Sequence, residues 1–74
     1  MNNVWTDQEL KAAEFARRAA MNYKKSAEYH ESGDIEKALH HALLAATEIE
    51  YSTLHANKAT DYYIKTIIDD MLEF

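Results

Sequence analysis

Histidine and glutamate side chains recur at intervals of seven residues in the second half of the chain. His41, Glu48 and His55 follow this spacing, which places all three on one face of a helix. Both residue types bind transition metals, but each step of seven residues spans about 10 Å of helix. The Glu-x-x-His motif of helical di-iron sites is also missing. We therefore predict no metal and no cofactor, and keep a bundle metal-binding protein, using these residues across two copies, as an alternative.

Residues for nucleophilic or phosphate chemistry lack a suitable setting. The chain contains no cysteine, and its serines, Ser26, Ser32 and Ser52, fall within or at the end of predicted helices. A phosphate-binding loop needs several glycines, and Gly33 is the only one here. The sequence therefore predicts that the protein is not an enzyme.

Four basic residues form two pairs that share one face of the first predicted helix. These are Arg17, Arg18, Lys24 and Lys25. Such a face can bind phosphates, which leaves a nucleic-acid-linked regulator as an alternative. However, the net charge is -5, the segment 34–73 holds eight acidic residues and three lysines, and no aromatic residues interleave with the four bases. Nucleic acid is therefore an unlikely partner, and these four residues with Tyr51 are predicted to bind a protein.

The segment 34–73 lacks glycine and proline and keeps one unbroken heptad spacing of small and apolar residues. This predicts a single helix over about 35–73 that faces another helix closely. The facing residues are expected to be Ile35, Ala38, Ala42, Ala45, Ile49, Ser52, Ala56, Ala59, Tyr63 and Thr66. A first helix over about 7–32 is predicted from the capping-box pattern of Thr6 and Glu9. Its facing stripe is Ala12, Ala16, Ala19, Tyr23, Ser26 and His30.

Gly33 and Asp34 predict the turn between the two helices. Glycine suits the left-handed position after a helix, and aspartate caps the start of the next one. A turn this short makes the helices antiparallel neighbours. The predicted fold class is therefore all-α, a long antiparallel helical hairpin forming a single domain over 1–74.

The second helix is longer than the first, so its C-terminal end should extend past the hairpin. This extension is the most apolar part of the chain, and an exposed apolar patch indicates an association site. A break near Asn57, with the last segment folded back as a third helix, is the alternative. If the helix is continuous, the predicted oligomer interface is Tyr62, Ile64, Ile67, Ile68, Met71 and Leu72.

A second apolar edge follows the longer helix at Leu39, Leu43 and Ala46. Apolar residues on two sides of a helix are typical of a four-helix bundle. A chain of 74 residues also buries little surface by itself and commonly needs oligomerisation. We therefore expect a homodimer in which two hairpins form a four-helix bundle.

The residues around the predicted turn resemble the middle of a tetratricopeptide repeat. In that family a small residue and a tyrosine end one helix, a Gly-Asp turn follows, and the next helix opens with Lys-Ala-Leu. Ser26, Tyr29, Ala38 and Ala45 match those positions, whereas Asn22 and Lys25 stand where the family has tryptophan and leucine. No second copy follows at a 34-residue period. The resemblance implies a protein-binding scaffold.

The function expected from these observations is a small acidic protein-interaction module, acting as an adaptor, inhibitor or regulator. Its partners would be a second copy of itself and another protein, with no role for a membrane, because no apolar run is long enough to span one. The absence of cysteine and of a secretory signal pattern favours a cytoplasmic location.

Overall fold

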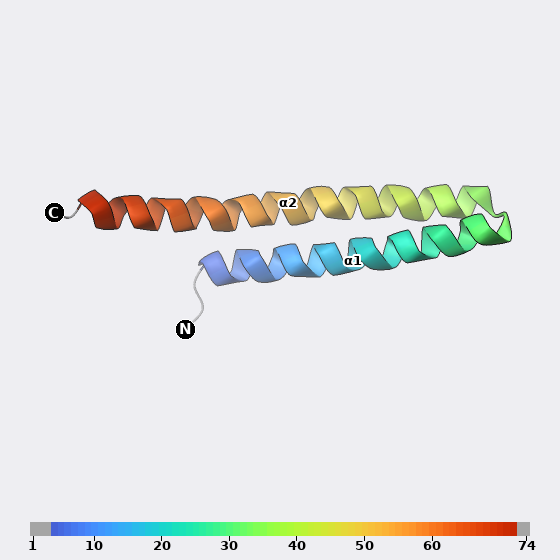
Figure 1. The fold of residues 1–74 in the computed structure, drawn as a ribbon, viewed down its shortest axis with the longest axis horizontal. Coiled ribbons are helices and arrows are strands. Elements are labelled where there is room, and N and C mark those ends of the chain that lie inside the picture. Colours follow the sequence, from blue (N-terminus) through green and yellow to red (C-terminus); the bar gives the residue numbers. More distant parts are fainter. Residues whose placement is uncertain (1–3, 73–74) are drawn as a thin grey trace.

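Two long antiparallel helices make up the structure, a computed structural model that describes residues 4–72 and the side chains of residues 5–71. Helix α1 spans Val4–Ser32 and helix α2 spans Ile35–Leu72. They lie side by side along a rod measuring 63 × 21 × 12 Å, and α2 continues beyond the N-terminal end of α1 (Figure 1). The predicted hairpin is confirmed, and α2 runs through Asn57 without a break.

The turn has the geometry that its two residues predict. Gly33 adopts a φ of 84°, in the left-handed region. Its N–H donates to the carbonyl oxygen of His30 at 3.1 Å, and the N–H of Asp34 donates to that of Tyr29 at 2.9 Å. This pair of bonds is the Schellman motif. The carboxylate of Asp34 then accepts from the N–H of Lys37 at 3.2 Å and caps α2.

The start of α1 differs from the expectation. The helix begins at Val4, so Thr6 lies inside it rather than at its N-cap. The ring of Trp5 packs against Tyr63 of α2, with 5.0 Å between ring centroids. This contact supports a first turn that the capping-box pattern does not predict.

Small side chains form the contact between the helices. Among the described residues, the buried positions are Ala19, Ser26, Ala38, Ala45 and Ala59. Alanine and serine let two helix backbones approach closely, and both serines on the contact line use that closeness. Ser26 Oγ donates to the carbonyl oxygen of Ala38, and Ser52 Oγ donates to that of Ala12, each at 2.8 Å. The two bonds run in opposite directions and fix the level of one helix against the other.

Part of the predicted facing stripe is wrong. Ile35, Ile49 and Tyr23 are 59%, 43% and 45% exposed. Tyr63 is 47% exposed but packs on Trp5 of α1, as its place in the stripe predicts. Both helices are rotated so that the rows beginning at Gln8 and His41 pair across the alanine contact. The rows beginning at Glu9 and Ile35 flank its other side and stay largely exposed. The physical reason is hydrogen bonding, because polar side chains of the first two rows pair across the contact.

Candidate interaction surfaces

One side of the alanine contact is closed by polar and aromatic pairs, and we call it the paired face. It consists of Gln8, Phe15, Asn22 and Tyr29 from α1 with His41, Glu48, Tyr51 and His55 from α2. Asn22 is its centre: its Nδ2 donates to Glu48 Oε1 at 2.6 Å, and its Oδ1 accepts from His41 Nδ1 at 2.9 Å. The ring of His41 also stacks on Tyr29. These bonds fix the rotation of both helices.

His55 occupies a similar setting farther along the paired face. Its Nδ1 donates to Gln8 Oε1 at 2.5 Å, and its ring stacks on Phe15 at 5.6 Å. Burial lowers the pKa of His55 below its ordinary value of 6.5, and the charges of Lys58 and Lys11 lower it further. A neutral imidazole suits a structural contact with an amide and an aromatic ring.

The candidate metal ligands are therefore used inside the hairpin. His41 and Glu48 both bond to Asn22, whereas His55 bonds to Gln8. Within residues 4–72, no group of three or more acidic or histidine side chains is placed to hold a metal ion.

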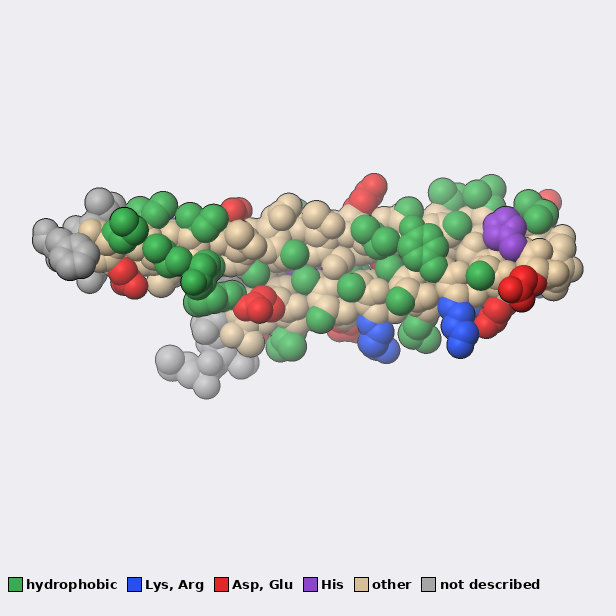
Figure 2. All heavy atoms as spheres, in the orientation of Figure 1, with side chains coloured by type: hydrophobic (Ala, Val, Ile, Leu, Met, Phe, Trp, Pro, Cys, Tyr) green, Lys and Arg blue, Asp and Glu red, His purple; other side chains and the backbone are tan. Residues whose placement is uncertain are grey.

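The opposite side of the alanine contact, which we call the open face, carries small and apolar side chains. Helical spacing places sixteen described residues on it, and Figure 2 looks onto it. They are Glu9, Ala13, Ala16, Ala20, Tyr23, Ala27 and His30 of α1, and Ile35, Leu39, Ala42, Ala46, Ile49, Thr53, Ala56, Thr60 and Tyr63 of α2.

The open face is nearly free of charge. Of its sixteen residues, Glu9 is the single carboxylate, His30 is the single histidine, and none is lysine or arginine. In Figure 2 the lysine and arginine side chains lie along the outer edge of α1. The face is apolar, yet its large side chains are exposed, with Leu39 at 57%. An exposed apolar surface of this length with so little charge is typical of a protein-binding face.

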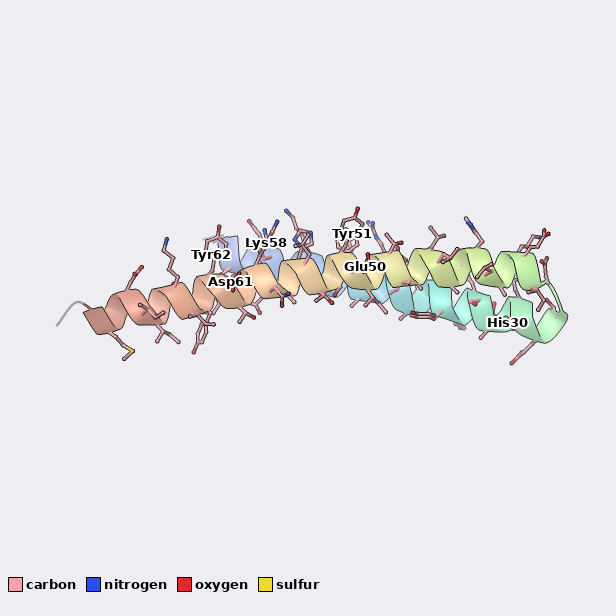
Figure 3. The ribbon with its side chains drawn as sticks, turned by 90° about the horizontal axis from the view of Figure 1, so that it is seen from above. His30, Glu50, Tyr51, Lys58, Asp61 and Tyr62 are labelled. Atoms are coloured by element: carbon pink, nitrogen blue, oxygen red, sulfur yellow. The ribbon has the colours of Figure 1, made fainter. Side chains whose placement is uncertain are left out.

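A hollow of about 380 Å³ interrupts the open face near the free end of the hairpin. Glu9, Ala56 and Tyr63 lie at its wall beside Trp5. A second hollow of similar volume lies on the other side of α2, between Gln8, Lys58 and Tyr62. Figure 3 shows Tyr51, Lys58 and Tyr62 on one side of α2, away from the side on which His30 lies.

The predicted oligomer interface lies on the part of α2 that extends past α1. Because Trp5 contacts Tyr63, the extension begins at Ile64, and we call 64–72 the overhang. Ile64, Ile67, Ile68 and Met71 are all exposed. Tyr62, beside its start, is 44% exposed, and the side chain of Leu72 lies outside the described residues.

The residues predicted to bind another protein lie on exposed surface in two places. Arg17, Arg18, Lys24 and Lys25 are exposed on α1, where Arg18 pairs with Glu14 at 2.7 Å and lies over the Phe15 ring. Tyr51 of α2 packs against that same ring from the paired face, with 5.3 Å between ring centroids and an angle of 31° between the rings. Arg18 and Tyr51 thus meet at Phe15, although they come from different helices.

Comparisons with protein-family models, with curated proteins and with solved structures find no match to this chain. No helix within residues 4–72 is both long and apolar enough to cross a membrane.

Sequence reasoning missed the open face as a unit. Its signal was present, because Glu9, Ala16, Tyr23 and His30 are spaced by seven, as are Ile35, Ala42, Ile49 and Ala56. Most of these residues were assigned to the contact between the helices instead.

Proposed function

We propose that this protein is a non-catalytic protein-interaction module that acts as a homo-oligomer. One observation supports this most directly. The buried side chains of the described residues are alanines and one serine, whereas the leucines, isoleucines and most tyrosines are exposed. The hairpin buries its small residues and leaves its large apolar residues exposed to water.

The stability of a lone hairpin supports the same proposal. Burying a large aliphatic side chain contributes roughly 1.5–3 kcal/mol, and a methyl group contributes far less. Among residues 5–71, no large side chain is fully buried. A chain of this size usually gains its missing stability from disulfides, a metal or association. Without cysteine, association is the route that its exposed surface suits.

Two apolar surfaces are available for this role. The open face is long and includes residues of both helices, whereas the overhang is short and belongs to α2 alone. The sequence-based assignment of self-association to the overhang stays a prediction. The edge where Arg18 and Tyr51 meet is the surface proposed for a different protein, because it combines charge with an exposed aromatic ring.

The experiment is light scattering on a sizing column across a concentration series. We expect a mass of twice 8.6 kDa that falls only on strong dilution. The double change Ile67→Asp, Ile68→Asp tests the overhang, and Leu54→Asp, on exposed surface outside the open face and the overhang, is its matched control. A folded monomer at every concentration would contradict the proposal.

A further inference from the structure

We propose that a second copy of this chain covers the open face with its own open face, and that the two hairpins lie antiparallel. The two-fold axis would pass between Ala19 and Ala20 on α1 and between Ala45 and Ala46 on α2. In this arrangement each α1 packs on the α1 of the other copy, and each α2 packs on the other α2. The inference deepens the proposed function and rests on it, because it specifies how the homo-oligomer forms.

The row of α1 residues on the open face is complementary to the same row of a second copy that runs in the opposite direction. Glu9, Ala16, Tyr23 and His30 follow one another at intervals of seven. An antiparallel copy centred between Ala19 and Ala20 places Glu9 opposite His30, and Ala16 opposite Tyr23. The carboxylate of Glu9 then accepts a hydrogen bond from an imidazole N–H, and the exposed tyrosine ring meets an alanine. The face's one carboxylate and one histidine thus become partners.

The row of α2 residues shows the same property independently. Ile35, Ala42, Ile49 and Ala56 also follow one another at intervals of seven. A copy centred between Ala45 and Ala46 places Ile35 opposite Ala56, and Ala42 opposite Ile49. Large side chains therefore meet small ones at every step, as in interdigitated helix packing.

The serine hydrogen bonds between α1 and α2 show which residues of the two helices lie at the same level, and hence whether one two-fold axis can serve both. They place Ala12 level with Ser52, and Ser26 level with Ala38. The midpoint between the two bonds falls at Ala19 on α1 and at Ala45 on α2. This is within one residue of the centre that each row requires separately. One two-fold axis can therefore serve both rows along 9–30 and 35–56, as docking of a second copy requires.

Docking with both turns at the same end is less favourable. It would place α1 against the α2 of the other copy, with Glu9 near Ala56 and His30 near Ile35. The Glu9 carboxylate would then face Ala56 and would lack the imidazole of His30 as a partner, and covering a charge without its partner is unfavourable. The antiparallel arrangement pairs that charge.

The area is close to that of a standard dimer interface. The open face is about 33 Å long over residues 9–30 of α1, and the molecule is 21 Å wide. Its footprint is therefore on the order of 700 Å² per copy, against about 800 Å² in a standard interface. Each overhang would extend past the turn of the other copy, so this interface would not use the residues of the overhang.

The absence of cysteine in the sequence allows a direct test by single-cysteine variants. Ala20→Cys and Ala46→Cys each lie beside the axis, where the two Cα atoms can approach within the roughly 7 Å that a disulfide permits. Under mild oxidation we expect each variant, by itself, to shift from 8.6 kDa to twice that mass on a non-reducing gel. Thr47→Cys, exposed and outside the open face, is the matched control and should stay at 8.6 kDa.

Mixing two single-cysteine variants tests which residues of the two copies lie opposite each other. Ala13→Cys and Ala27→Cys should link only when mixed, because each lies within one residue of the level opposite the other. If Ala20→Cys and Ala46→Cys link only when mixed together, the turns lie at the same end and the inference is wrong. A wild-type dimer in which Ala20→Cys does not link overturns the inference but leaves the homo-oligomer intact. A wild-type monomer overturns both.

An exchange of charges gives a second measurement that does not depend on oxidation. Glu9→Lys and His30→Glu should each raise the dissociation constant of the dimer about two- to thirtyfold, because each change removes two exposed pairs at once. The double variant should return towards the wild-type value, because it restores opposite charges at both sites. Additive weakening in the double variant would contradict the pairing.

Discussion

The hydroxyl of Ser26 donates a 2.8 Å hydrogen bond to the carbonyl oxygen of Ala38 on the other helix. Ser26 is 6% exposed and Ala38 is fully buried, so the bond lies where the two backbones are closest. Ser52 and Ala12 make the reciprocal bond farther along. Together these two bonds define how far α1 is shifted along α2.

Replacing Ser26 tests this relationship. Ser26→Ala keeps the side chain small and removes the bond, so we expect the free energy of unfolding to fall by about 1 kcal/mol. Chemical denaturation followed by circular dichroism measures the change. Ser32→Ala, at an exposed serine that bonds only within α1, is the control and should have a smaller effect. Equal effects for the two variants would mean that the bond between the helices contributes no more to stability than a bond within one helix.

Enlarging a contact alanine should separate the helices. Ala45 is fully buried, and a leucine there has no space without moving α1 away. We expect Ala45→Leu to lower the free energy of unfolding by about 1–3 kcal/mol. Thr47→Leu adds the same side chain on exposed surface and should leave stability within about 0.5 kcal/mol of wild type. Thermal unfolding at one fixed protein concentration compares the two, and an unchanged Ala45→Leu variant would argue against close helix contact.

Replacing Gly33 should change the stability of the protein through backbone conformation alone. Apart from Gly33 and its two chain neighbours, no residue comes within 4 Å of the position that a Cβ would occupy, so contact with the rest of the protein is not at issue. The φ of 84° disfavours any other L-residue, and Gly33→Ala should destabilise the protein by about 1 kcal/mol. Gly33→Asn should be milder, since asparagine tolerates this region better. Denaturant titration distinguishes the two, and the opposite order would contradict this explanation.

Stability should depend on pH through His55. Because its pKa in the folded protein lies below 6.5, the unfolded chain binds a proton more readily than the folded one does. The contribution of the neutral ring is therefore present at higher pH, and is lost as the pH falls below 6.5. We expect the unfolding temperature to drop between neutral pH and about pH 5.

The variant His55→Gln isolates that contribution. Glutamine has no proton to gain in this range. The pH dependence between neutral and mildly acidic solution should be shallower in the variant than in wild type, with both measured at equal protein concentration. Identical slopes would assign the dependence to other groups.

The sequence by itself determined the hairpin. Gly33 and Asp34 mark the turn, because one supplies a left-handed residue and the other a cap. The absence of glycine and proline from 34–73 made a continuous α2 the expected outcome, and the structure confirms it. The predicted contact of Ala38, Ala45 and Ala59 with α1 is confirmed as well, because small residues at intervals of seven form a line that a second helix can approach.

Only the tertiary structure decided how each helix is rotated about its own axis. Rows on both sides of the alanine line, one beginning at Ile35 and one at His41, continue the heptad spacing equally well. Heptad periodicity alone fits either row, and hydrophobicity favoured the row of Ile35 as the one in contact with α1. The structure turns the row of His41 inwards instead, since Asn22 and Gln8 of α1 supply hydrogen-bond partners for His41, Glu48 and His55. Partners far apart in sequence make that choice, and for this reason spacing within one helix cannot reveal it.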